Sequence, residues 1–308
     1  MQDGNAGNAG DLGKHGVYLS LLAALRRTFP WRGVLNVIEA HAGKGLYVSR
    51  QTHWRAFQEM DQHQKHVLHV PLLSAQIAVM APEPVGVGPI VDLEPGECPY
   101  AGSSVLHASV LSSSPNRSLV CYDHCANVRE TLQRVLQEAR FDAIRDQVEI
   151  LDPGGQSEPV ILEALQAGRY GRSHVLHLDP FAFVMKKRDR LTRALYHDLI
   201  QECDARVADE SLGAASVFLT WGCNSMAAQA DLFKGGYMGG LHGGFQDLRD
   251  LVRPTQRIVI AWCWRLYFSL IVIVPERLRD DLARCLYADL ARLRAFCSYF
   301  EISRRLAS

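Results

Sequence analysis

A short apolar run that ends in Asp-Pro, within residues 174–183, restricts the fold of this chain more than any other feature. The run reads His-Val-Leu-His-Leu-Asp-Pro-Phe-Ala-Phe. Its apolar part predicts a buried strand, and Pro180 ends that strand because proline has a fixed φ and no backbone N–H. Asp179 is therefore expected at the carboxyl end of a strand, which in an open α/β sheet is the edge where ligands bind. A strand that simply ends in a turn could have the same residues. The rest of the chain therefore decides whether Asp179 belongs to a ligand-binding edge.

Apolar runs of strand length alternate with stretches of helical spacing along most of the chain. We expect strands at residues 34–38, 118–123, 148–152, 175–178, 215–221, 257–262 and 267–274. We expect helices at residues 17–28, 104–111, 128–139, 160–167, 189–208 and 276–296. Strands joined through helices predict an α/β fold with a parallel sheet covered on both faces. The last two strands are close enough for a hairpin, which puts one reversed strand into a Rossmann-like sheet of about seven.

Residues 50–98 interrupt this alternation. They begin with a stretch rich in His and Gln and end with one rich in Pro, Gly and Val. This composition predicts a small inserted subdomain or lid, so that residues 1–49 and 99–308 form the main domain. The insert contains histidines at positions 53, 63, 66 and 69. Their spacing matches no metal-ligand pattern, and we expect no metal.

The composition argues against several classes of protein. Lys+Arg and Asp+Glu both number 33, so no overall basic charge points to a nucleic-acid partner. The eight cysteines form no CxxC pair, which favours reduced thiols over disulfides or a zinc site. The start of the chain has no signal-peptide pattern. The most apolar run, residues 258–274, contains Arg265 and predicts two strands rather than a membrane span. We therefore expect a cytoplasmic protein with no membrane contact.

Polar residues follow the first four predicted strands. Glu39-Ala-His-Ala-Gly-Lys-Gly45 follows the first, and Asp123, Asp152 and Asp179 end the next three. The carboxyl ends of parallel strands share one edge of a sheet, so these groups are expected to converge there. An acid after the second strand suits the two hydroxyls of a ribose, and an acid after the third can accept a hydrogen bond from an adenine amino group. The arrangement predicts a ligand that contains adenosine.

The turn after the first strand narrows the choice of ligand. His41-Ala-Gly-Lys-Gly45 lacks the three-glycine dinucleotide fingerprint. Lys44 is followed by glycine rather than by the Ser or Thr of a phosphate-binding loop. The reversed strand of the terminal hairpin is a variation found in methyltransferases that use S-adenosylmethionine. We therefore expect S-adenosyl-L-methionine as the cofactor.

Two motifs near the start of the chain resemble one family of these enzymes. Residues 5–15, which read Asn-Ala-Gly-Asn-Ala-Gly-Asp-Leu-Gly-Lys-His, resemble the Ala-Gly-Asn…Asp…Lys-His segment of the RlmJ-type methyltransferases. Residues 39–45 are similar to that family's His-Ala-Gly-x-Gly motif. The family also carries an inserted helical subdomain before a Gly-Ser step, and the insert at residues 50–98 followed by Gly102-Ser103 resembles that arrangement. The family methylates an adenine N6 of large-subunit ribosomal RNA. The resemblance implies a class I methyltransferase fold, a role in rRNA processing and a nucleic-acid substrate, RNA in preference to DNA.

The resemblance also implies roles for individual residues. Asp179 matches the acid of the family's Asp-Pro-Pro-Tyr motif, which accepts a hydrogen bond from the adenine amino group and steers its nitrogen toward the methyl group. Phe181 stands at the second proline of that motif, and either Phe181 or Phe183 is expected to stack on the base. Lys14 is expected to place its loop over the site. The expected cofactor contacts are His15, His41, Gly43, Ser103, Asp123, Asp152 and Asp179.

The same motif leaves alternatives open. The chain reads Asp179-Pro-Phe-Ala182 where the family has Asp-Pro-Pro-Tyr. One alternative is a non-catalytic descendant of the fold that acts as a binding or interaction module, which predicts weak or absent cofactor binding. Replacing Asp179 with alanine would then leave the biological activity unchanged. The other alternative is a methyltransferase that acts on a protein or a small molecule.

Overall fold

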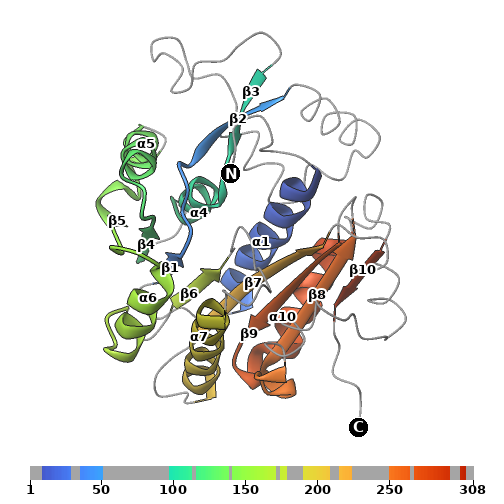
Figure 1. Ribbon diagram of the computed structural model, residues 1–308. Helices are drawn as coiled ribbons and strands as arrows, with labels where there is room; N and C mark the ends of the chain where they lie inside the picture. Colours follow the sequence, from blue (N-terminus) through green and yellow to red (C-terminus); the bar gives the residue numbers. More distant parts are fainter. Residues whose placement is uncertain are drawn as a thin grey trace.

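The computed structural model of the chain (Figure 1) describes residues 9–28, 35–50, 97–112, 116–138, 141–170, 174–178, 190–208, 215–223, 250–263, 267–291 and 299–302. Asp179 and Phe181 lie outside the described residues, and so does most of the predicted insert, residues 51–96. Lys14 lies within a described helix, but its side chain is outside the described part.

One large sheet forms the centre of the molecule (Figure 1). Its strand order is β10-β8-β9-β7-β6-β1-β4-β5. The strands are β1 Leu35–Glu39, β4 Arg117–Tyr122, β5 Val148–Leu151, β6 His174–Leu178, β7 Ala215–Cys223, β8 Arg257–Cys263, β9 Tyr267–Ile273 and β10 Tyr299–Ile302. Neighbours from β5 to β7 are parallel, whereas β9 runs antiparallel between β7 and β8. The predicted mixed α/β sheet, with a hairpin that contributes a reversed strand, is confirmed.

Strand β10 is a difference from the predicted sheet. It pairs antiparallel with β8 at the edge of the sheet, where Tyr299 lies opposite Cys263 and Ile302 opposite Ile260. The strand has only 4 residues, which are too few to show an alternating pattern in the sequence. Pairing with β8, rather than local propensity, therefore determines its conformation.

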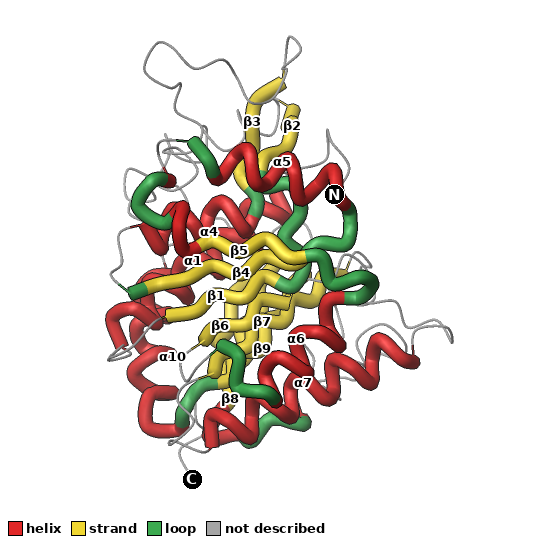
Figure 2. The backbone as a smooth tube through the Cα atoms, turned by 90° about the vertical axis from the view of Figure 1, so that its left-hand side faces the viewer, coloured by secondary structure: helices red, strands yellow, loops and turns green. Residues whose placement is uncertain are grey.

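Helices cover both faces of the sheet (Figure 2). One face is covered by α1 Ala9–Thr28, α4 Ser103–Ser112, α5 Ala126–Leu136 and α10 Glu276–Leu290, and the other by α6 Ser157–Gln166 and α7 Arg190–Ala208. Short 3-10 helices, Arg145–Gln147 and Pro254–Gln256, precede β5 and β8. Successive strand residues point to opposite faces. Val37 accordingly joins the core beneath α1, and Ile38 joins the core beneath α7. The fold has three layers, α/β/α.

Helix α1 begins at Ala9, eight residues before the start that the apolar spacing predicts. All residues from 15 to 22 are buried, so the helix is covered on every side rather than on one stripe. It packs between the sheet, α4 and α10, with Arg27 reaching Asp289 of α10. Gly10, Gly13 and Gly16 lower its intrinsic helix propensity, and packing overrides that preference.

Two further strands form a ribbon outside the main sheet. β2 Leu46–Arg50 and β3 Glu97–Ala101 pair antiparallel, with Leu46 opposite Ala101 and Arg50 opposite Glu97. Residues 51–96 connect the two strands and lie outside the described residues. The boundaries of the predicted inserted subdomain therefore fall on this ribbon, and the subdomain itself stays a prediction.

Gly45 closes the turn after β1 and has no room for a side chain. Its φ is +80°, and a Cβ there would lie 2.7 Å from Cδ1 of Leu132 and 2.8 Å from Cγ2 of Val105. We expect Gly45→Ala to lower the free energy of unfolding by roughly 2–4 kcal/mol, because backbone strain and overpacking add. Urea unfolding followed by circular dichroism measures this change.

Gly154 provides the matched control for this variant. Its φ is +68°, and a Cβ there would meet nothing within 4 Å. Gly154→Ala therefore adds backbone strain alone and is expected to cost about 1 kcal/mol. Equal losses in the two variants would contradict the role of packing at Gly45.

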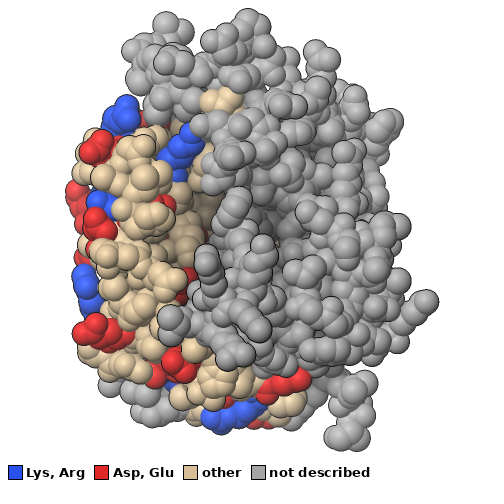
Figure 3. Space-filling model, viewed as in Figure 1, with Lys and Arg blue, Asp and Glu red and all other residues tan. Residues whose placement is uncertain are grey.

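Charged side chains of both signs are interspersed over the described part of the face in Figure 3. Neither sign gathers into a large patch on this part of the surface. Among the described residues, no helix is long and apolar enough to cross a membrane.

Candidate functional site

The carboxyl ends of the parallel strands define one edge of the sheet, called the carboxyl edge here. β1 lies between β4 and β6. From β1 the chain continues to β4 and β5 on one side, and from β6 it continues to β7 on the other. The winding direction therefore reverses between β1 and β6. Ligands of open α/β sheets bind outside the carboxyl ends at such a point.

Gly43 and Asp123 meet at this edge, as the sequence predicts for the ends of the first two strands. The backbone N–H of Gly43 donates a hydrogen bond of 3.2 Å to Oδ2 of Asp123. Oδ1 of the same carboxylate accepts a bond of 2.9 Å from the N–H of Cys125. Each carboxylate oxygen has two acceptor positions, so Asp123 retains capacity for further donors. The turn after β1 and the end of β4 thus form one unit.

Asp152 joins this unit through a residue that the sequence pattern does not single out. Nη2 of Arg129, on α5, lies 2.7 Å from Oδ2 of Asp152, and Nη1 donates a bond of 2.8 Å to the carbonyl of Asp123. Asp152 also accepts a bond of 2.8 Å from the N–H of Gly154. Half of its side chain is exposed, at 50%. The ends of β4 and β5 are therefore linked by one guanidinium group.

Hydrogen bonds from the start of α4 hold the turn after β1 in place. The N–H of Gly102 donates a bond of 2.7 Å to the carbonyl of Gly45. The hydroxyl of Ser104 donates to the carbonyl of Ala42. Ser103, a predicted cofactor contact, is the first residue of α4 and is half-buried. These bonds fix the position of the glycine turn relative to the helix that follows the ribbon.

His41 faces a buried acid on the other side of the turn. Its Nε2 lies 3.1 Å from Oε1 of Glu158, in the first turn of α6, and the hydroxyl of Tyr196 donates a bond of 2.7 Å to the same oxygen. Burial raises the pKa of Glu158, but the hydrogen bond and charge of His41 and the bond from Tyr196 outweigh it and bring the pKa to about 2. Part of the bonding capacity of His41 is therefore used inside the protein.

This network predicts a pH dependence of stability. The folded-state pKa of Glu158 lies below its usual value of about 4.3, so its contribution is present above that value. The contribution is lost as the pH falls toward the folded-state pKa. We expect Glu158→Gln to flatten the stability curve between about pH 5 and about pH 2, measured by urea unfolding across that range. A variant curve parallel to that of the unmodified protein would contradict this expectation.

His15, another predicted cofactor contact, is buried in α1. Its exposed fraction is 2%, and its Nδ1 lies 2.7 Å from the hydroxyl of Tyr100. The two rings stack with centroids 5.6 Å apart. The structure therefore joins His15 to the end of the β2–β3 ribbon through Tyr100.

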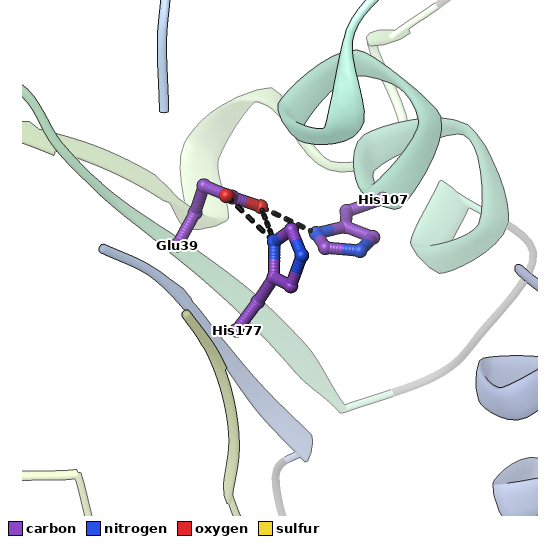
Figure 4. Close-up of side chains that lie close together, drawn as sticks. All are labelled: Glu39, His107 and His177. Atoms are coloured by element: carbon purple, nitrogen blue, oxygen red, sulfur yellow. Dashed lines mark hydrogen bonds and ion pairs between the residues drawn. The ribbon is translucent and has the colours of Figure 1, made fainter. Parts of the chain in front are cut away.

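A buried cluster of Glu39, His107 and His177 lies beneath the carboxyl edge (Figure 4). Nδ1 of His177 is 2.7 Å from Oε1 and 2.8 Å from Oε2 of Glu39, and Nδ1 of His107 is 3.0 Å from Oε2. Burial raises the pKa of Glu39, but the charge of His177 and the contacts with both histidines outweigh it and hold the pKa well below its usual range. Burial lowers the pKa of His107. The sequence pattern does not bring these histidines to notice.

No protein-family model and no curated protein matches this sequence. The fold does have a known counterpart. The crystal structure of protein LPL1258 from Legionella pneumophila, described under the family model DUF519, matches with a TM-score of 0.62 at 13% identity. The match covers 98% of this chain and 99% of that one. At this identity the likeness concerns the fold alone.

Two weaker matches to solved structures bear the description O-methyltransferase. One is a predicted O-methyltransferase, protein Atu636 from Agrobacterium tumefaciens, at 13% identity over 65% of this chain and 79% of that chain. The other is NcsB1 from neocarzinostatin biosynthesis, in complex with S-adenosylmethionine, at 13% identity over 87% of this chain and 70% of that chain. Both TM-scores are 0.29. These likenesses are too weak to support an argument.

The described residues bring together part of the predicted site. Gly43, Asp123 and Asp152 are linked at the carboxyl edge. His15 contacts Tyr100, and His41 contacts Glu158 of α6. Their contacts with a cofactor stay predictions. Asp179, Phe181 and the side chain of Lys14 lie outside the described residues. The structure adds four residues that the sequence pattern did not single out: Arg129, Glu158, His107 and His177.

Proposed function

We propose that this chain is an S-adenosylmethionine-dependent methyltransferase of the RlmJ type, acting on an amino group of a nucleic-acid base in RNA. The observation that supports it most is the bond between Gly43 and Asp123, which joins the ends of β1 and β4 beside the switch point of the sheet. A glycine turn and an acid in these positions suit the adenosine part of a ligand in sheets of this kind.

The order of the strands supports the same choice of cofactor. From β5 to β7 the order agrees with the dinucleotide-binding sheet. The reversed strand β9 between β7 and β8 departs from that sheet. Together with the lack of a three-glycine fingerprint at residues 41–45, this departure favours S-adenosylmethionine over a nicotinamide dinucleotide.

The residues at the edge fit the adenosine part of this cofactor. Asp123 has acceptor positions left after its bonds to the N–H groups of Gly43 and Cys125, as the two hydroxyls of a ribose require. Asp152 is half exposed and lies one strand further. Its carboxylate can accept a hydrogen bond from an adenine amino group.

Positioning is the main catalytic contribution of the chain in this proposal. When bound, S-adenosylmethionine supplies a methyl group on a sulfonium, which is already a good leaving group. Asp179 accepts a hydrogen bond from the amino group of the base and orients its nitrogen lone pair. Phe181 stacks on the base. Both follow directly on β6, next to β1 at the switch point.

Calorimetry with S-adenosylmethionine and S-adenosylhomocysteine tests the cofactor. We expect both to bind with one site per chain. If neither compound gives a heat of binding at millimolar concentration, the proposal is ruled out. Incubation with methyl-labelled cofactor and separate RNA, DNA and protein fractions then tests the substrate, with label expected in the RNA.

The altered motif after β6 favours a second candidate, a non-catalytic binding module. Ala182 stands where the resembled family has Tyr, which removes the usual stacking residue. Asp179→Ala distinguishes the candidates. A methyltransferase transfers the label before the change and loses the transfer after it, whereas a binding module shows no transfer before or after the change.

A further inference from the structure

The buried cluster of Glu39, His107 and His177 has the composition of a metal site. Its members come from β1, α4 and β6, three elements far apart in the sequence. One donor atom from each residue lies within 4.8 Å of the other two, and Figure 4 shows both imidazole rings turned toward the carboxylate. Two imidazoles and one carboxylate are a ligand set that zinc and similar divalent ions take in proteins.

The distances within the cluster are close to those around a bound ion. Metal–donor bonds of about 2.0–2.2 Å place the donors of a tetrahedral site roughly 3.4 Å apart. The contacts of Glu39 with His177 and His107 span 2.7 to 3.0 Å. An outward movement of about half an ångström is therefore enough to admit an ion.

An ion pair between Glu39 and His177 does not explain why a second histidine, His107, is buried beside the same carboxylate. Nδ1 of His177 already contacts both oxygens of Glu39. His107 is 1% exposed, and the 3.0 Å contact of its Nδ1 with Oε2 lacks hydrogen-bond geometry. Placing another polar ring in an apolar core costs free energy unless it gains a partner. A cation between the three side chains uses the lone pairs of all of them.

A buried cysteine lies in the same row of the sheet. Cys121 on β4 and His177 on β6 are both in register with Glu39 on β1. Residues in register on parallel strands point to the same face, so the thiol lies on the face that carries the cluster. Its sulfur is not among the donor atoms that lie within 4.8 Å of one another, and burial together with the charge of Glu39 raises the pKa of the thiol. Cys121 therefore borders the site without being one of its ligands.

We propose that Glu39, His107 and His177 bind a zinc-class divalent ion that fastens β1, β6 and α4 together. The site departs from the expectation of no metal, which considered the histidines of residues 50–98 and the spacing of the cysteines but not Glu39, His107 and His177. It does not depend on the methyltransferase proposal, because it rests on the contacts among three buried side chains and on no cofactor contact. Glu39 precedes the glycine turn and His177 precedes Asp179, so the ion would hold both segments in place.

Metal analysis of the whole chain tests this proposal. The protein is produced with zinc supplementation and without a histidine tag, dialysed against a chelator, and analysed by plasma mass spectrometry. We expect about one zinc per chain to remain, because the site is closed to solvent. Refolding from denaturant with zinc is expected to raise the melting temperature by about 5–10 °C over refolding with chelator. Less than a tenth of an equivalent together with equal melting temperatures would overturn the site.

Variants distinguish this site from surface binding. His107→Gln is expected to lose the bound zinc and the difference between the two refolded forms. His197→Asn is the control, since His197 is 44% exposed on α7, and it should keep both. Zinc retained by His107→Gln would overturn the assignment. If His107→Gln does not fold, the proposal is still tested on the unmodified protein by its zinc content and by the difference in melting temperature between the two refolded forms.

Cobalt tests which donors hold the ion. Refolding with Co²⁺ is expected to give visible absorption from the bound ion and no near-ultraviolet thiolate-to-metal band, because the donors are two imidazoles and one carboxylate. His107→Gln should lose the visible absorption. A thiolate-to-metal band, or visible absorption unchanged in His107→Gln, would overturn this ligand set.

Discussion

Replacing Asp123 with alanine is expected to weaken S-adenosylmethionine binding about a hundred-fold. Two hydrogen bonds from ribose hydroxyls to a carboxylate contribute at least about 1.5 kcal/mol each, or roughly 3 kcal/mol together. The variant also removes the acceptor for the N–H groups of Gly43 and Cys125, which loosens the turn that faces the ligand. Calorimetry on the purified variant measures the change in dissociation constant.

Asp142→Ala is the matched control for this experiment. Asp142 is an exposed acid whose partner is Arg145 in the same segment, away from the carboxyl edge. Its replacement removes the same charge and should leave the affinity within two-fold of the unmodified protein, since a surface pair of this kind contributes about 0–1 kcal/mol to stability alone. Unchanged affinity in a folded Asp123→Ala variant would contradict the assignment of the ribose site.

Replacing Glu39 with alanine is expected to lower the free energy of unfolding by roughly 3–5 kcal/mol. The carboxylate is fully buried between two imidazoles. Its removal leaves His107 and His177 in the core without the negative charge that they face, and it leaves a cavity as well. Urea unfolding in the presence of chelator measures this loss for the metal-free protein.

A triple variant tests the physical reason for that loss. Glu39, His107 and His177 are all replaced with leucine, which removes every polar group of the cluster and keeps a similar volume. Because no buried polar group is then left without its partner, the triple variant should be more stable than Glu39→Ala. A triple variant at least as unstable as the single one would show that shape, not charge, controls the core at this place.

The parallel part of the central sheet could be predicted from the sequence because its strands are short apolar runs, and an acid ends or follows four of them. The runs before Asp123 and Asp152 carry their own end signals, and parallel topology brings those ends together. The structure agrees, since the N–H of Gly43 bonds Asp123 and Arg129 spans Asp123 and Asp152. Alternation of strands and helices was thus sufficient for the parallel part of the fold.

The buried clusters could not be predicted, because they depend on register between distant segments. His107 lies among apolar residues of a helix, and its sequence neighbours give no sign of Glu39. Glu158 lies in the first turn of α6, where an acid is favoured by the helix dipole alone. Only the folded chain shows that Glu158 faces His41 and Tyr196. Polar residues that look like ordinary helix surface are the ones that sequence patterns miss.

The β2–β3 ribbon has a consequence for how this architecture can diversify. Arg50 and Glu97 lie directly opposite each other at its far end, so the chain leaves and returns at neighbouring points. A tight Asn-Gly hairpin turn can bridge such a pair, and the entropy of loop closure grows only slowly with loop length. The segment between Arg50 and Glu97 can therefore be shortened, lengthened or exchanged with little effect on the main sheet. Recombination at this one junction is a route by which a lineage can acquire a new recognition element on an old scaffold.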